Sequence, residues 1–105
     1  MKILVTGNMG YVGPVVVEHL RATFPDAEIN GFDTGFFGSC LTGTDVMPEV
    51  LLDKQYFGDV REVDVSLLHG TDVIIHLAAI SNDPIGNVYE KVTYEINHVA
   101  TVELA

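Results

Sequence analysis

The stretch Thr6–Gly13, which reads TGNMGYVG, directly follows the apolar run Lys2–Val5 and precedes an apolar segment with helical spacing. Its glycines are spaced GxxGxxG. This spacing lets a strand turn tightly into a helix, and it brings backbone N–H groups close to a pyrophosphate at the positive end of the helix dipole. The stretch therefore predicts a strand–turn–helix unit that binds a dinucleotide.

Every residue of the turn is a candidate contact for the pyrophosphate. These residues are Gly7, Asn8, Met9, Gly10, Tyr11, Val12 and Gly13. A glycine triplet alone is weak evidence, because a strand–turn–helix with permissive glycines shows the same pattern without any ligand. The rest of the chain has to decide between these two interpretations.

The composition predicts one globular domain spanning residues 1–105. Apolar residues make up 48% of the chain and the mean hydropathy is +0.30, which argues against disorder. The longest apolar stretch, around Val73–Ile80, is too short to cross a membrane. The opening MKILVTG is not expected to be a targeting segment, because Gly7 ends its apolar run too early.

The charge, cysteine and histidine content limits which partners, which compartment and which metal sites are expected. The formal net charge of −10 disfavours nucleic acid and anionic membranes. Cys40 is the sole cysteine, which fits a reducing cytoplasm. The histidines show no ligand spacing, so we expect no metal site.

Alternating strands and helices predict an α/β fold. The expected strands are Lys2–Thr6, Glu28–Asp33, Gln55–Val60 and Asp72–Ala79. The first expected helix starts near Pro14 and ends before Pro25. The second is Glu62–His69, with Val65 and Leu68 facing inward and Gly70 as its cap. The third is Val88–Ala105, with an apolar face of Val92, Ile96, Val99 and Val102. Right-handed crossovers then give a parallel Rossmann-like sheet with helices on both faces, for which we expect the strand order 3-2-1-4.

Asp33 is the candidate acid for the adenosine ribose. It ends the second expected strand, 20 residues after Gly13, where a dinucleotide fold places a carboxylate that accepts hydrogen bonds from ribose hydroxyls. The carboxylate would repel a 2′-phosphate, so the sequence favours NAD over NADP. The alternative is that Asp33 is an ordinary turn residue.

The last expected strand also ends in a way that suits a flat cofactor. Ala78 and Ala79 are small enough for a ligand to lie against the backbone. His76 is interpreted as a core or strand-end histidine rather than a catalytic base. Phe36 and Phe37, in the loop after Asp33, either pack on the domain's own surface or cover the adenosine half of the cofactor or meet a partner. Residues 81–87 are expected to form a polar loop.

Together these motifs resemble the extended short-chain dehydrogenases/reductases, specifically the NAD-dependent sugar-nucleotide epimerases and dehydratases. The resemblance covers nearly all of the chain. It is carried by the TGxxGxxG turn, Asp33, the DVR segment at Asp59, the HLAA segment at Leu77 and the N-x-x-A-T segment at Asn97.

The resemblance implies NAD as the cofactor and adds further site residues. It implies that Asp59 and Val60 contact adenine and that Leu77, Ala78 and Ala79 flank the cofactor. Asn97, also assigned to the cofactor site, is implied to be mainly architectural around the active site.

The family's catalytic Ser or Thr and its Tyr-x-x-x-Lys motif have no match here. Thr93 stands four residues after Tyr89, and His98 four residues after Tyr94. We therefore expect no catalytic residue in this chain, which resembles the N-terminal cofactor-binding part of a longer enzyme. A nucleotide sugar would be a partner only of that intact enzyme.

Two other hypotheses stay open. The chain is alternatively a freestanding, non-catalytic dinucleotide-binding or interaction module, or a purely structural fold with accidental glycines. In the resembling family a fifth strand covers the fourth, so an open fourth-strand edge predicts a homodimer formed through that edge or by swapping the last helix.

Overall fold

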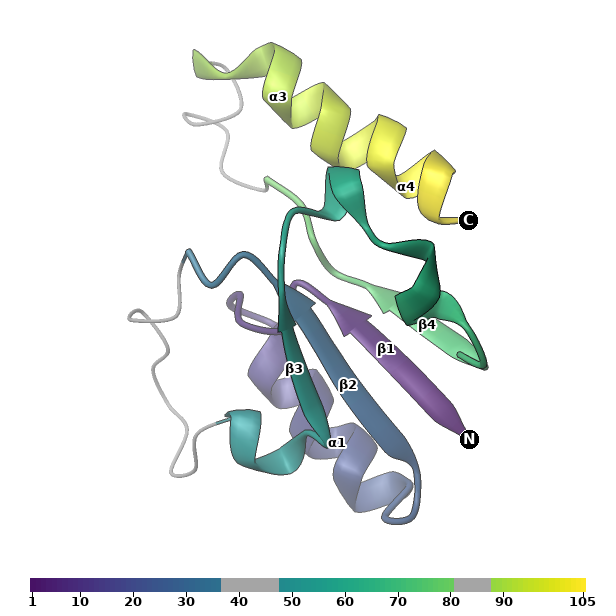
Figure 1. The fold of residues 1–105 in the computed structure, drawn as a ribbon. Helices are drawn as coiled ribbons and strands as arrows, with labels where there is room; N and C mark the ends of the chain where they lie inside the picture. The colour runs from purple at the N-terminus through teal and green to yellow at the C-terminus, as the bar shows by residue number, and fades with distance from the viewer. Residues whose placement is uncertain (37–47, 81–87) are drawn as a thin grey trace.

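The computed structural model describes residues 1–36, 48–80 and 88–105. Its strands form one parallel sheet in the order β3-β2-β1-β4 (Figure 1). They are β1 (Lys2–Thr6), β2 (Glu28–Asp33), β3 (Lys54–Phe57) and β4 (Val73–His76). The predicted strand order is confirmed, as are the bounds of β1 and β2. Phe37 and the expected loop 81–87 lie outside the described residues.

Helices cover both faces of this sheet. The helix α1 (Gly13–Thr23) lies behind it in Figure 1. The short 3₁₀ helices are η2 (Pro48–Leu51), η3 (Val60–Glu62) and η4 (Val65–Leu68). The C-terminal helix comprises α3 (Glu90–Tyr94), the π-helical turn η5 (Glu95–Val99) and α4 (Ala100–Leu104). Among the described residues, no helix is long and apolar enough to span a bilayer.

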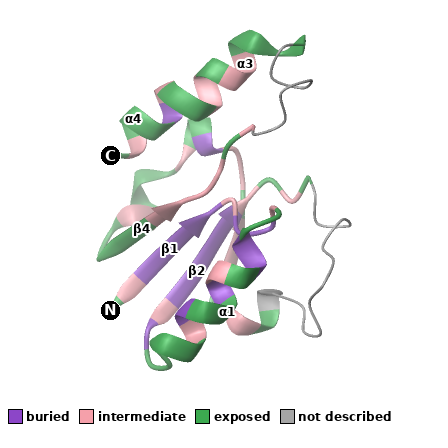
Figure 2. Ribbon diagram, turned by 180° about the vertical axis from the view of Figure 1, so that it is seen from behind, coloured by how far each residue is buried: buried purple, intermediate pink, exposed green. Residues whose placement is uncertain are grey.

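The core on the α1 side follows from the alternation of side chains along the central strands. Ile3 and Val5 of β1 and Ile29 of β2 point toward α1, whose Val17 and Leu20 pack on them. All five are buried, and Figure 2 shows β1 and β2 as the most buried strands. Burying each such side chain stabilises the fold by roughly 1.5–3 kcal/mol.

A second core lies on the opposite face. Leu4 and Phe32 point away from α1 and pack with Val60 of η3 and Ala100 of the C-terminal helix. The C-terminal helix is therefore joined by apolar contacts to the same two central strands that carry the α1 core. Both faces of β1 and β2 are closed, as a continuous apolar β1 predicts.

The predicted third strand and the helix after it require correction. β3 ends at Phe57 instead of Val60, because the Asp59 carboxylate accepts from the Arg61 N–H and starts η3 there. In place of one helix over Glu62–His69, Asp64 caps a second 3₁₀ turn through the Ser66 N–H. Two side-chain caps in close succession favour two short turns over a continuous helix.

The exposure of Val65 and Val102 and the end of β4 also differ from expectation. Val65 is exposed, whereas Leu68 packs in the second core as predicted, and Gly70 adopts the left-handed φ of a cap. β4 ends at His76, short of Ala79, because its partner β1 ends where Gly7 turns away. Val102 is exposed, since the π turn adds a residue to the helical repeat and moves Ala100 into the core instead.

Candidate functional site

The carboxyl ends of all the strands meet at one edge of the sheet, because the strands are parallel (Figure 1). This edge brings together the predicted site residues of four separate segments. They are the glycine turn after β1, Asp33 at the end of β2, Asp59 and Val60 after β3, and Leu77–Ala79 after β4. Asn97, in η5, reaches the same edge from the C-terminal helix.

The glycine turn begins with a residue that only glycine suits. Gly7 has a φ of 72°, and its N–H donates to the Phe32 carbonyl at 2.8 Å. A Cβ at Gly7 would lie 2.6 Å from the Ala78 backbone nitrogen. The turn and the exit of β4 are therefore packed backbone against backbone, and no side chain fits between them.

The turn is closed by a second backbone contact, made by Gly13. A Cβ at Gly13 would overlap the backbone carbonyl of Asn8. The Asn8 side chain is fully buried and faces β3, where its Nδ2 donates to Gln55 Oε1 at 2.6 Å and its Oδ1 accepts from Gln55 Nε2 at 3.2 Å. Because this amide pair occupies the Asn8 side chain, only the Asn8 backbone faces the edge.

The first turn of α1 has the features of an anion-binding helix end. No side chain caps it, because its N-cap residue is Val12, and Pro14 occupies the first turn. Uncapped N–H groups and the helix dipole favour a negative ligand at this position. Tyr11 beside it is 95% exposed, so the turn is open to solvent.

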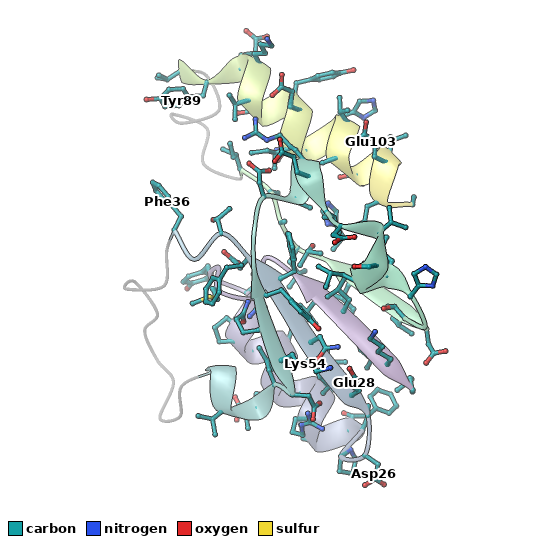
Figure 3. All side chains as sticks on the ribbon, viewed as in Figure 1. Asp26, Glu28, Phe36, Lys54, Tyr89 and Glu103 are labelled. Atoms are coloured by element: carbon teal, nitrogen blue, oxygen red, sulfur yellow. The ribbon has the colours of Figure 1, made fainter. Side chains whose placement is uncertain are left out.

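Asp33 is joined to the glycine turn by its carboxylate. One oxygen, Oδ2, accepts from the Met9 N–H at 3.0 Å, and the other, Oδ1, accepts from the Gly35 N–H at 2.8 Å. A carboxylate has about four lone-pair directions, so these two bonds fix its orientation and leave acceptor capacity for a ligand. Phe36 follows at this edge with its ring 83% exposed (Figure 3).

The Asp59 carboxylate is held by Arg61. Arg61 donates to it through Nε at 3.0 Å and through Nη2 at 2.6 Å. The Arg61 backbone N–H also donates to it, at the start of η3. These bonds lower the pKa of Asp59, chiefly through the Arg61 side chain, and they raise the pKa of Arg61. Val60 is buried in the second core, so its side chain does not face the edge.

Asn97 clamps the segment after β4. Its Oδ1 accepts from the Ile80 N–H and its Nδ2 donates to the Ile80 carbonyl, both at 2.8 Å. The Asn97 amide therefore forms with Ile80 the pair of hydrogen bonds that a neighbouring strand would form, one residue beyond Leu77–Ala79. This placement agrees with an architectural role for Asn97.

A polar chain that no sequence pattern predicted links β1, β4 and the C-terminal helix. His76 Nδ1 lies 2.7 Å from Thr6 Oγ1, and its Nε2 lies 3.0 Å from Thr101 Oγ1. The Thr101 hydroxyl donates to the Asn97 carbonyl, so it accepts from the histidine, which must carry its proton on Nε2. Nδ1 then accepts from the Thr6 hydroxyl. Only the position of His76 at a strand end hinted at this role.

We expect acid to destabilise the chain through His76. Burial lowers the pKa of His76 below its ordinary value of 6.5. The unfolded chain therefore takes up a proton at a higher pH than the folded chain, and stability is lost as the pH falls from about 6.5 toward the lowered folded value. Urea midpoints measured between about pH 7.5 and 5 should fall with acidity.

The control for this prediction is the exposed His19. His76→Gln should flatten the pH dependence of the urea midpoint, whereas His19→Gln should leave it unchanged. An equal slope in both variants would show that His76 is not the titrating group.

The two best-formed hollows on the described surface lie beside η3 and not at the glycine turn. One of about 340 Å³ lies between η3 and the C-terminal helix and is lined mainly by Arg61, Glu62, Glu95 and Glu103. Within the described residues, no cluster of three His, Cys, Asp or Glu side chains suits a metal ion. The glycine turn is an open surface, so the candidate site is defined by its backbone groups and carboxylates.

Comparisons with known proteins agree with this geometry. The model of the NAD dependent epimerase/dehydratase family matches residues 3–105. The dTDP-glucose 4,6-dehydratase of Neisseria meningitidis serogroup B is 33% identical over 84 residues, which cover 77% of this chain and 24% of that protein. The present chain therefore spans about a quarter of this relative.

Solved structures show the same fold. Pal from Bacillus thuringiensis superposes with a TM-score of 0.78 at 26% identity, over 99% of this chain and 34% of that one. The UDP-glucuronic acid 4-epimerase from Bacillus cereus, in complex with NAD, gives a TM-score of 0.73 at 26% identity over the same shares. With the family match across nearly every residue, these findings show that the chain belongs to the NAD dependent epimerase/dehydratase family.

Proposed function

We propose that this chain is the NAD-binding portion of a sugar-nucleotide epimerase or dehydratase, and that residues 1–105 form one nucleotide-binding domain. The observation that carries the proposal is the succession of groups along the carboxyl edge of the sheet. The glycine turn and the uncapped N-terminus of α1 follow β1, a carboxylate ends β2, a second carboxylate follows β3, and small residues follow β4.

This succession matches the parts of NAD in order. The pyrophosphate would lie on the glycine turn at the uncapped end of α1, and the adenosine ribose would reach Asp33 on the neighbouring strand. The adenine would then lie one strand further out, beside Asp59 and the Val60 backbone. The nicotinamide half would extend the other way, over Leu77–Ala79.

Asp33 supports NAD as the form of the cofactor. Its carboxylate is fixed by two backbone N–H groups and has acceptor sites left for ribose hydroxyls. A 2′-phosphate would add negative charge beside an ionised carboxylate, which is unfavourable without a nearby cation. The bound cofactor supplies a reversible hydride acceptor; the residues of this chain bind and orient it.

We further propose that the 105-residue chain by itself catalyses nothing and acts in the cytoplasm. Neither Tyr89 nor Tyr94 has a lysine four residues on, so the chain offers no tyrosine activated to take a substrate proton. A nucleotide sugar would be the substrate of a longer enzyme that contains this domain. Reduction of NAD by this chain with any nucleotide sugar would contradict the proposal.

Calorimetry with NAD and NADP tests the proposed binding. We expect NAD to bind at about micromolar concentration and NADP to bind more weakly. Gly10→Asp should abolish NAD binding, because it adds a carboxylate where the pyrophosphate would lie. Gly70→Asp is the charge control: it adds the same charge away from the turn, with nothing within 4 Å, and should leave NAD binding unchanged although its left-handed φ adds strain. Absence of NAD binding to the parent chain would overturn the proposal.

β4 is an edge strand of the described sheet, and we therefore predict that copies of the chain associate with one another. β4 is at the end of the sheet, and Val73 and Ile74 on it are 40% and 37% exposed. Unpaired strand edges of this kind promote pairing between chains. We expect a homodimer formed through β4 or by exchange of the C-terminal helix. A monomer by sedimentation equilibrium at tens of micromolar protein would contradict this prediction.

A further inference from the structure

Arg61 makes contacts that a simple surface cation does not. Its guanidinium binds both oxygens of Asp59, and its own backbone N–H donates to the same carboxylate. The remaining nitrogen, Nη1, donates to Glu95 Oε2 at 3.0 Å. A planar guanidinium that is bound on two sides fixes the plane and direction of the carboxylate it holds.

Glu95, the second partner of Arg61, lies on the C-terminal helix and so outside the loop that holds Asp59 and Arg61. It is the first residue of the π turn η5, and Lys91, one helical turn earlier, lies 3.9 Å from its carboxylate. The apolar packing of Val60 against Ala100 holds the same loop against the same helix. The C-terminal helix thus supports the exit of β3 through one polar and one apolar contact.

The direction of the Asp59 carboxylate matters because of where it lies. The Gly58 N–H, just before it, donates to the Asp33 carbonyl at 3.0 Å, so the two carboxylates follow adjacent strands at the same edge. A nucleotide with its ribose at Asp33 would place its base beside Asp59. Arg61 supplies three donor groups to Asp59, so of about four acceptor directions roughly one is left, which suits a base that carries an exocyclic amino group.

We propose that Arg61 is a positioning residue: it orients the Asp59 carboxylate for an amino-bearing base and so makes the site specific for adenine over hypoxanthine. The inference rests on the proposed NAD-binding function. Arg61 itself touches no ligand. Its side chain is 37% exposed, and surface ion pairs of this kind add little to stability, so its removal should leave the fold intact.

The test compares NAD with nicotinamide hypoxanthine dinucleotide, which has a carbonyl oxygen in place of the amino group. Dissociation constants for both are measured by calorimetry on the 105-residue chain. We expect the parent chain to prefer NAD by roughly tenfold, the effect of one charge-assisted hydrogen bond. Asp59→Asn should remove this preference, and Arg61→Gln should remove most of it.

Two variants separate positioning from a general effect on the fold. Arg61→Lys restores the charge without the bidentate geometry and should recover only part of the preference. Lys54→Gln removes one positive charge from the surface of β3, where Lys54 lies 3.9 Å from Glu28, and should leave the preference unchanged (Figure 3). The urea midpoint of each variant is measured alongside.

The outcomes distinguish the inference from the function on which it rests. If the parent chain binds neither nucleotide, both are overturned. If it binds both equally, or if Arg61→Gln changes both dissociation constants by the same factor, NAD binding stands and the positioning role of Arg61 is overturned. A loss of preference without a change in the urea midpoint supports the role.

Discussion

Gly7→Ala is expected to destabilise the chain far more than Gly70→Ala, although the two glycines have nearly the same φ, 72° and 70°. Either alanine costs about 1–2 kcal/mol for its left-handed backbone. At Gly7 the new Cβ would also lie 2.6 Å from the Ala78 nitrogen, whereas at Gly70 it would meet nothing within 4 Å. Overpacking against a fixed backbone typically adds about 1–3 kcal/mol.

Urea unfolding of the two variants measures this difference directly, because the conformational cost is common to both. Gly7→Ala should also abolish NAD binding, since the turn must shift away from the exit of β4. Equal free energies of unfolding for the two variants would show that the turn is not packed against Ala78.

Asp33→Asn is expected to have the largest effect on cofactor choice. The amide can still accept from one of the two N–H groups that hold Asp33, but it loses the charge that strengthens hydrogen bonds to ribose hydroxyls. Charge-assisted hydrogen bonds contribute about 1.5–3 kcal/mol each, so NAD affinity should fall by roughly ten- to hundredfold. Repulsion of a 2′-phosphate disappears at the same time, and the ratio of NADP to NAD affinity should rise.

Asp26→Asn is the matched control for this substitution. Asp26 is an exposed residue of the turn between α1 and β2, at the opposite edge of the sheet (Figure 3). It changes the net charge equally and should alter neither affinity. An unchanged NADP-to-NAD ratio in Asp33→Asn would contradict the assignment of Asp33 to the ribose.

The sequence was sufficient to predict the elements whose pattern is local. β1 and β2 have the expected bounds because a buried apolar run ends at Gly7 in one case and at Asp33 in the other. The helices lie on both faces of the sheet as expected, because the handedness of parallel crossovers depends on chain chirality rather than on particular residues.

The ends of the other elements could not be predicted because side-chain contacts decide them. β3 ends early since Asp59 caps a 3₁₀ turn, and the helix expected after it is divided by a second cap at Asp64. In the C-terminal helix, the π turn shifts the buried face, so Val102 is exposed although its spacing is helical.

The polar contacts around the candidate site were beyond sequence reasoning for a related reason. Arg61 and Glu95 are 34 positions apart, and His76 and Thr101 are 25 positions apart, so no periodicity relates them. The spacing of Asp59 and Arg61 does favour a local side-chain cap, and it is the one signal that could have indicated the role of Arg61.

The central claim is that the carboxyl edge of this sheet binds NAD, and amide chemical-shift mapping during an NAD titration tests it most directly. We expect the perturbed amides to be those of Gly7–Gly13, Asp33, Asp59, Val60 and Leu77–Ala79. The amides at the end of α1, residues 18–23, should remain unchanged. Perturbations centred on the hollow between η3 and the C-terminal helix, or none at saturating NAD, would contradict the claim.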